Sequence, residues 1–256
     1  MDKDNNKTTF IFSSVMVVIV AVVLSVTAII LAPYQEKNSR VEKMKNILSS
    51  ISITTETDQT ETAFDKYITK QIVLNNKGEE LTNNVKAFDI DLKKELDKSK
   101  TGNADKQLFP LFICNKDGKS FYIIPVRGKG LWGPIWGYIS LESDMNTVDG
   151  VSFGHKSETP GLGAEIETQK FQQQFVGKKI FDESGKFVSV DVIKGGANTD
   201  DLHGVDAISG ATITSNGVNN MLENILKNYI PYFKKQQTKS AQKRDRSQPT
   251  KNKKRR

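Results

Sequence analysis

The pattern of apolar and polar positions divides the chain into a long uncharged stretch, a series of short apolar segments and a helical repeat. Residues 10–32 form the uncharged stretch, which is interrupted only by four Ser or Thr side chains. At about 1.5 Å rise per residue, a helix of this length spans a hydrocarbon core of roughly 30 Å. We predict a transmembrane helix here. The alternative, a cleaved signal peptide, is disfavoured because the run is long and no small-x-small cleavage site follows it.

A second helical pattern follows the predicted membrane span. Its apolar residues are Val41, Met44, Ile47, Leu48 and Ile51. This spacing predicts a second, juxtamembrane helix that continues outward from the bilayer. Ser and Thr are then frequent over residues 49–62, which indicates a short linker before the main domain.

Short apolar segments separated by turn residues fill the middle of the chain and predict strands. The expected strands are 71–74, 108–113, 120–126, 136–141, 150–153, 178–181 and 188–193. Asp117-Gly118 lies between two of them and is a strong hairpin signal. Helices are expected at 163–175 and 218–233. Closely spaced hairpins without regular helical crossovers predict an α+β domain, with a mostly antiparallel, curved sheet and flanking helices.

The last of these helices has the clearest apolar face. From Val218 onward, apolar residues recur at 218, 221, 222, 225, 226, 229 and 230. The pattern predicts that the helix starts near Thr214 or Ser215, either of which can cap it. The hydroxyl of Thr212 then lies beside free N–H groups at the positive end of a helix dipole, where a phosphate is favoured.

Three motifs occur in order along the soluble part. Residues 130–137 read Gly-Leu-Trp-Gly-Pro-Ile-Trp-Gly, residues 158–163 read Glu-Thr-Pro-Gly-Leu-Gly, and Asp206 precedes Ser209-Gly210-Ala211-Thr212. The last resembles the motif on which a flavin transferase attaches FMN through its phosphate. Together with the N-terminal membrane helix, all three resemble the C-subunit family of the sodium-translocating NADH:quinone reductases, over residues from about 10 to 233.

The resemblance implies a covalent cofactor and a relay function. FMN is expected as a phosphodiester on Thr212, added by a separate transferase for which Ser209-Gly210-Ala211 forms a small exposed turn. Gly210 lets the backbone turn there, and Ala211 leaves room beside the acceptor. Asp206 is expected to orient this turn through an Asx-type hydrogen bond.

The resemblance also implies flavin-facing residues and partner subunits. Glu158, Thr159 and Leu162 are expected to face the flavin, with an ordinary helix-entry loop as the alternative. The chain is then a non-autonomous translocase subunit with no catalytic residue of its own. It passes electrons between carriers in the other subunits, to which NADH oxidation, quinone reduction and the sodium path belong.

The net charge is unevenly distributed. The chain carries +7, and residues 234–256 contain eleven Lys or Arg and one acid, so this tail holds +10 and the remainder −3. The tail has no aromatic residue interleaved with its charges, so we expect a disordered, solvated segment and no nucleic-acid site. A basic nucleic-acid-binding membrane protein is a hypothesis that rests on this tail alone.

Several other signals give negative or modest predictions. The single cysteine, Cys114, cannot form an intrachain disulfide and is expected in the core, and the spacing of the two histidines predicts no metal site. Residues 128–133 match Gly-x-Gly-x-x-Gly, but strand signals follow where a dinucleotide site needs a helix, so a tight turn is predicted. Trp132 and Trp136 are expected either near the flavin or in the core.

The expected layout is a tail at 1–9, a membrane helix at 10–32, the juxtamembrane segment at 33–62, an FMN-binding domain at 63–233 and a basic tail at 234–256. The family implies an inner-membrane protein with its flavin domain on the periplasmic side. Charge counting points the other way, because four Lys or Arg follow the membrane helix and two precede it. Alternative functions are the flavin subunit of the related ferredoxin-NAD ion-translocating complex and a tethered FMN sensory or binding domain.

Overall fold

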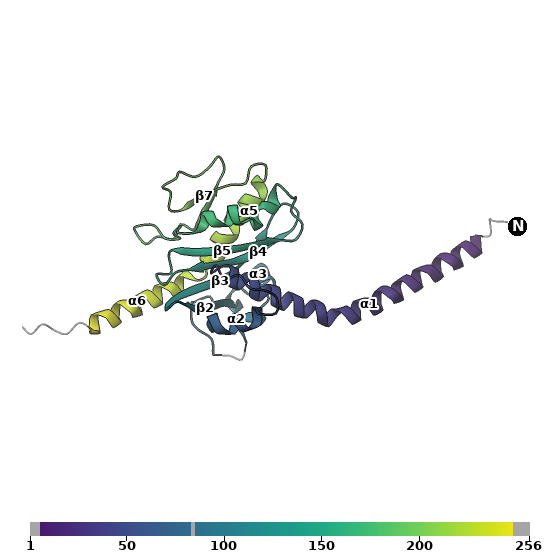
Figure 1. The fold of residues 1–256 in the computed structure, drawn as a ribbon, viewed down its shortest axis with the longest axis horizontal. Helices are drawn as coiled ribbons and strands as arrows, with labels where there is room; N and C mark the ends of the chain where they lie inside the picture. Colours follow the sequence, from purple (N-terminus) through teal and green to yellow (C-terminus); the bar gives the residue numbers. More distant parts are fainter. Residues whose placement is uncertain (1–5, 83–84, 248–256) are drawn as a thin grey trace, which may run out of the picture. The chain divides into compact units, whose positions relative to one another are not determined.

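A computed structural model describes residues 6–82 and 85–247 of the chain, which divides into two units between Met44 and Lys45. The first unit belongs to helix α1, Asn6–Ser49, which is continuous (Figure 1). This is the one helix of the described residues that is long and apolar enough to cross a membrane, and residues 10–32 are exposed along it. The second helix expected after the span is therefore the end of α1. Pro33 lies inside the helix without ending it.

Five antiparallel strands in sequential order form the main sheet of the second unit. They are β1 (Ile68–Leu74), β2 (Phe109–Lys116), β3 (Lys119–Lys129), β4 (Pro134–Leu141) and β5 (Val148–His155). The predicted hairpin at Asp117-Gly118 joins β2 to β3, and both residues have positive φ, 52° and 75°. This conformation matches the right-handed twist of the strands, which explains the Asp-Gly signal. The predicted α+β class with a mostly antiparallel sheet is confirmed.

The sheet is covered on both faces. Helix α5 (Thr212–Leu226) lies on one face and α2 (Thr60–Tyr67) on the other (Figure 1). Phe109 contacts Tyr229, which follows α5, with ring centroids 5.9 Å apart. On the other face Phe112 contacts Phe64 of α2 at 6.4 Å. Cys114 is fully buried, as expected for a core residue.

Short helices replace the single helix expected at 163–175. They are η3 (Gly163–Glu167), α4 (Gln169–Gln172) and η4 (Gln173–Phe175). Thr168 interrupts the helix with an extended backbone, and its hydroxyl accepts a hydrogen bond from the N–H of Phe171. A threonine in this conformation caps a new helix and cannot continue the old one.

A small parallel pair of strands lies outside the main sheet. It consists of β6 (Asp191–Ile193) and β7 (Gly204–Asp206). The strand expected at 178–181 is wrong, because these residues form only isolated bridges, Thr147 with Lys179 and Phe181 with Phe187. Only the end of the strand expected at 188–193 is a strand, and β7 lies in a segment for which no strand was predicted.

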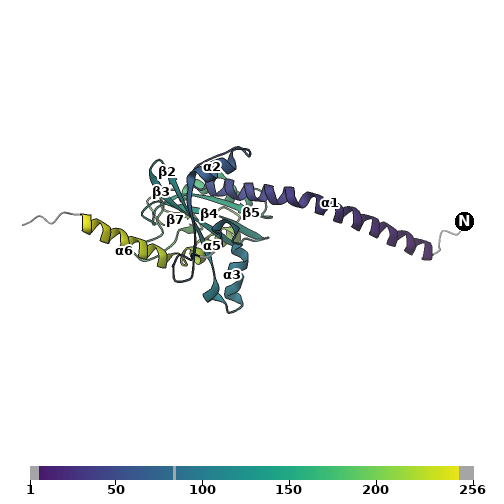
Figure 2. The same cartoon turned by 90° about the horizontal axis from the view of Figure 1, so that it is seen from below.

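Polar helices account for other differences from the expected elements. Helix α3 (Leu92–Lys100) was not predicted, because only Glu95 is buried on it and it lacks an apolar stripe. Helix α2 likewise begins inside the segment interpreted as a linker. Figure 2 shows α2 and α3 on opposite sides of the domain. The 3-10 turns η1 (Ala87–Asp89) and η2 (Ala104–Lys106) flank α3.

The helix expected at 218–233 is two helices. Helix α5 ends at Leu226, and α6 (Ile230–Ser247) begins after a break, with Pro231 as its second residue. Proline has no N–H group to donate to the carbonyl four residues earlier, so it is tolerated in the first turn of a helix but disrupts the interior of a continuous one. Helix α6 extends through residues 234–247, where disorder was expected. Lys235 bonds there to the carbonyl of Lys77 at 2.9 Å and lies 3.7 Å from Glu79. The rest of the predicted tail, residues 248–256, lies outside the described residues.

Candidate functional site

A small cavity of about 230 Å³ opens at the N-terminal end of α5. Six of the eight residues predicted for the cofactor site line it: Glu158, Thr159, Leu162, Gly210, Ala211 and Thr212. The other four lining residues are Leu131, Gly163, Ile213 and Thr214. Ser209 and Asp206 do not line it. The structure thus brings together two of the three motifs and one residue of the third.

The turn before α5 leaves the Thr212 side chain accessible. Gly210 has a φ of +77°, in the region that glycine adopts without strain, and a Cβ on it would lie 2.8 Å from Leu162. Thr212 is the first residue of α5 and is exposed. The residue at the N-cap is Ala211, and no side chain caps the helix.

The predicted capping by Thr214 or Ser215 is wrong. The helix begins at Thr212, so both residues lie inside its first turn, where they are buried. The hydroxyl of Ser215 accepts a hydrogen bond from the N–H of Ile208 at 3.2 Å. The hydroxyl of Thr214 donates to Glu158 at 2.6 Å. Because neither side chain turns back to cap the helix, its positive end remains available to an anion.

Glu158 joins the three segments that form the cavity. It is 5% exposed, and its carboxylate accepts hydrogen bonds from the N–H groups of Trp132 at 2.9 Å and of Leu131 and Gly133 at 3.3 Å. The hydroxyl of Thr214 supplies the fourth. Burial raises the pKa of Glu158, but these four hydrogen bonds outweigh burial and hold the pKa below its ordinary value of 4.5. The carboxylate is therefore ionised and fully engaged by protein donors.

Close packing at Gly163 makes this arrangement possible. A Cβ on Gly163 would lie 2.5 Å from an Oε of Glu158 and 2.6 Å from the hydroxyl of Thr214. Real Cβ atoms do not approach other atoms so closely, so only glycine fits at this point without displacing the Glu158 to Thr214 hydrogen bond.

Asp206 does not orient the turn that carries Thr212. Its carboxylate accepts a hydrogen bond from the N–H of Ala197 at 2.8 Å, in the loop between β6 and β7. Its own N–H donates to the side chain of Gln174 at 2.8 Å. The expected Asx-type contact is therefore replaced by one that orders a different loop.

The predicted tight turn between β3 and β4 is formed by residues 130–133, and Gly128 and Lys129 are the last residues of β3. The N–H of Gly130 donates to the carbonyl of Gly133 at 2.8 Å, and a strand follows at Pro134. Trp132 on this turn is 67% exposed, so the core interpretation is wrong for it. Trp136 is half-buried and lines a separate, larger groove.

Four cavity residues were not among those predicted for the cofactor site. Leu131 lies inside the first motif and Gly163 ends the second, so both could have been predicted from their positions in these motifs. Ile213 is 57% exposed at the start of α5, and the apolar face of this helix begins only at Val218. An apolar residue outside that face could have indicated a binding site. Thr214 gave no such sign, because its partner is 56 residues away.

Comparison with known proteins places these residues in a family. Residues 130–227 match the model of the FMN-binding domain, a span that runs from the β3–β4 turn to the end of α5 and encloses every cavity residue. The C-subunit of the Na(+)-translocating NADH-quinone reductase of Vibrio vulnificus is 34% identical, over 77% of this chain and 82% of that protein. The chain belongs to this C-subunit family.

Other members cover more of the chain and give its fold. The C-subunit from Neisseria meningitidis serogroup B is 34% identical, over 94% of this chain and 98% of that protein. The crystal structure of the C-subunit from Parabacteroides distasonis superposes with a TM-score of 0.71 at 41% identity, over 79% of this chain and 96% of that one. Members of the family thus share both the sequence and the fold of this chain, and the family expected from the three motifs is confirmed.

Proposed function

We propose that this chain is the FMN-carrying C-subunit of a sodium-translocating NADH:quinone reductase, with the flavin joined through its phosphate to Thr212. The observation that carries the proposal is an exposed threonine hydroxyl on the uncapped N-terminus of a helix, inside the region that matches the FMN-binding domain. Bound FMN supplies reversible one-electron and two-electron transfer.

The residues around Thr212 suit the phosphate end of FMN. The first N–H groups of a helix lack partners within the helix, and here no side chain caps them. Together with the helix dipole they favour a phosphate beside the Thr212 hydroxyl. Glu158 is the only acid among the ten residues that line the cavity. Its oxygens already accept hydrogen bonds from Thr214 and from three N–H groups of the β3–β4 turn, so it does not occupy the free N–H groups of the helix end.

Apolar side chains suit the ring end. Leu131, Leu162 and Ile213 are 45%, 39% and 57% exposed around the cavity. A cavity of about 230 Å³ is smaller than the usual range of roughly 300–1,000 Å³ for ligand pockets. It therefore shields only part of a flavin. A covalent tether prevents loss of a cofactor held so shallowly, and the exposed remainder is open to electron exchange with a partner subunit.

The chain does not activate its own acceptor. A threonine hydroxyl needs a base or a metal to attack a phosphorus centre near neutral pH. Glu158 is the one ionisable residue of the cavity, and its oxygens are engaged by Thr214 and three N–H groups. We infer that a separate flavin transferase performs the attachment and recognises the exposed Ser209 and Asp206 together with the Gly210-Ala211 turn. Glu158 acts as a positioning residue for the cavity.

The electron donors and acceptors belong to other subunits. The glycine-rich segment 128–133 is the end of β3 and a turn that leads into β4, with no helix after it, so it does not form a dinucleotide site. The similar proteins compared above are subunits of a NADH-quinone reductase, which favours this complex over the ferredoxin-linked one. Assay of the purified complex with NADH and quinone, against ferredoxin and NAD, distinguishes the two.

We also propose that α1 anchors the chain in the inner membrane with the flavin domain on the periplasmic side. The apolar run in α1 supports an anchor. The orientation follows the family expectation and opposes the count of flanking charges. Added protease should digest the flavin domain in intact spheroplasts. Protection of the domain would show that it lies on the cytoplasmic side.

In-gel fluorescence tests the proposed attachment. The full chain is co-expressed with a flavin transferase, denatured and separated on a gel. We expect a fluorescent band for the wild type and for Thr199→Ala, which changes an exposed threonine that does not line the cavity, and none for Thr212→Ala. A fluorescent Thr212→Ala band would refute attachment at this residue.

A further inference from the structure

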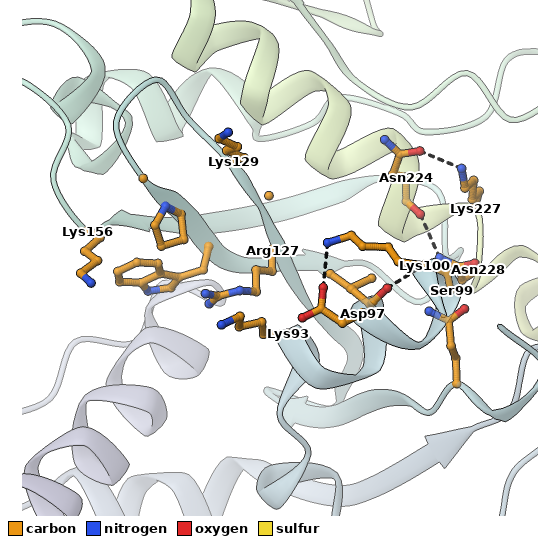
Figure 3. Close-up of a pocket in the computed structure, with 16 residues that line it drawn as sticks. Lys93, Asp97, Ser99, Lys100, Arg127, Lys129, Lys156, Asn224, Lys227 and Asn228 are labelled. Carbon is orange, nitrogen blue, oxygen red and sulfur yellow. Dashed lines mark hydrogen bonds and ion pairs between the residues drawn. The ribbon is translucent and has the colours of Figure 1, made fainter. Parts of the chain in front are cut away.

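A groove of about 960 Å³, separate from the flavin cavity, lies among α3, β3, β4 and the end of α5 (Figure 3). We call it the basic groove, because six of its lining residues are cationic and one is acidic. The cations are Lys93, Lys100, Arg127, Lys129, Lys156 and Lys227. Residues 1–233 as a whole carry a net charge of −3. Like charges repel, so this concentration on an otherwise acidic body indicates an anionic ligand.

Most of these cations have no protein partner. Lys100 pairs with Asp97 at 2.7 Å, and Lys227 bonds to the side chain of Asn224 at 2.7 Å. Among the side chains that the structure describes, in residues 6–82 and 85–238, those of Lys93, Arg127, Lys129 and Lys156 form no ion pair or hydrogen bond. The hydrogen bond from Lys100, together with the charges of Lys93 and Arg127, lowers the pKa of Asp97. Lys93 and Arg127 therefore act on the same region of the groove.

An aromatic side chain stands directly beside the arginine. Arg127 on β3 pairs in register with Trp136 on β4, and Trp136 pairs with Gly154 on β5. Residues opposite each other on neighbouring strands project on the same face, with Cβ atoms about 5 Å apart. Gly154 carries no side chain, and a Cβ there would lie 3.0 Å from the indole nitrogen. The indole is therefore seated over Gly154 while Trp136 also lines the groove.

We propose that the basic groove binds a phosphate-bearing ligand, with its phosphate on Arg127 and Lys93 and the remainder of the molecule against Trp136. The planar guanidinium donates two parallel hydrogen bonds to phosphate, and lysines add charge. The volume is at the upper end of the range for small-molecule sites, so the ligand is larger than inorganic phosphate. A soluble phosphate compound and an anionic phospholipid headgroup both supply this chemistry. No residue of the flavin cavity lines the groove, so ligand binding and flavin attachment can be measured separately.

Native mass spectrometry of the full chain released from detergent micelles tests the proposal. The probes are pyrophosphate, ADP and phosphatidylglycerol, titrated separately at about 150 mM ionic strength, where surface charges are screened beyond roughly 8 Å. We expect saturable 1:1 binding of at least one probe. Binding of ADP or pyrophosphate identifies a soluble ligand, and preferential binding of phosphatidylglycerol identifies a lipid headgroup.

Arg127→Ala should weaken the bound probe at least tenfold, as loss of a charge-assisted hydrogen bond predicts. Lys170→Ala removes an exposed lysine outside the groove and should leave affinity unchanged. If Arg127→Ala does not fold, the double variant Lys93→Ala, Lys156→Ala replaces two exposed lysines and tests the same loss. Flavin attachment to the variants reports folding separately. Absence of binding by all three probes, equal binding by Arg127→Ala, or binding of a polyglutamate peptide alone would overturn the proposal.

Discussion

Thr214 and Glu158, 56 positions apart in the chain, are joined by a hydrogen bond of 2.6 Å from the threonine hydroxyl to a carboxylate oxygen. The same carboxylate binds the backbone of the β3–β4 turn. One acidic side chain thus fixes the start of α5, which carries Thr212, against a turn 80 residues earlier. The position of the proposed flavin acceptor depends on this junction.

Removing the charge of Glu158 should destabilise the domain. In Glu158→Gln the amide nitrogen can only donate, so it opposes the N–H groups of the turn. Hydrogen bonds to charged groups contribute about 1.5–3 kcal/mol. For a domain of this size the loss corresponds to a decrease in Tm of roughly 3–12 °C. Calorimetry of the purified chain measures it, and Glu183→Gln, at an exposed position, serves as the control.

The stabilisation from Glu158 should depend on pH. Burial raises its pKa, but the hydrogen bonds from Thr214 and from three N–H groups lower the pKa by more, so that it lies below 4.5. A carboxyl whose pKa is lower in the folded state stabilises fully above its ordinary pKa, and this stabilisation is lost as the pH falls through the lowered value. The difference in Tm between wild type and Glu158→Gln should be constant from pH 7 to 5.5 and shrink below 4.5. A constant difference down to pH 3 would contradict this.

Thr214 and Thr212 should have opposite phenotypes. Thr214→Val removes a buried donor to an ionised carboxylate and should cost about 1–3 kcal/mol of unfolding free energy while leaving the acceptor hydroxyl in place. Thr212→Val changes an exposed residue and should cost less than about 0.5 kcal/mol but abolish flavin attachment. Thermal unfolding and in-gel fluorescence of both variants give the two readings. Equal loss of stability in both variants would contradict the assignment of a structural hydroxyl to Thr214 and an acceptor hydroxyl to Thr212.

A methyl group at Gly163 should disrupt the junction. In Gly163→Ala the new Cβ has to displace Glu158 or Thr214, and overpacking of this kind costs about 1–3 kcal/mol. Denaturant unfolding of the variant measures the loss through its midpoint. The combination Gly163→Ala, Thr214→Ser tests the mechanism, because removing the Thr214 methyl gives the displaced side chain room and should restore part of the stability. Full wild-type stability in Gly163→Ala would contradict the packing account.

The strands of the main sheet and the β2–β3 hairpin could be predicted, because each is specified by residues that are adjacent in the sequence. The strands of the main sheet are short apolar segments separated by turn residues, and Asp117-Gly118 shows its turn chemistry directly. Helix α3 was missed because its buried residue is Glu95, which no apolar period reveals. The interruption at Thr168 was missed because the apolar spacing continues across it.

The motifs that form the candidate site could be predicted from the sequence, but the contacts between their side chains could not. Glu158, Leu162 and Thr212 were assigned to one site only because their motifs resemble those of a known family. Thr214 and Ser215 were assigned to capping, because a threonine before an apolar run is a common capping signal. Their partners, Glu158 and Ile208, are set by tertiary structure. For the same reason Asp206 was expected to hold its own turn, whereas its carboxylate holds the loop at Ala197.

Mass spectrometry of the peptide that contains Thr212 shows directly whether FMN is attached to this residue. The full chain is expressed with a flavin transferase, digested and fragmented, with Thr212→Ala as the matched control. We predict that the wild-type peptide carries the mass of FMN less one water, located on Thr212, and that the variant peptide carries none. An unmodified wild-type peptide in a host with an active transferase, or an adduct on another residue, would contradict this prediction.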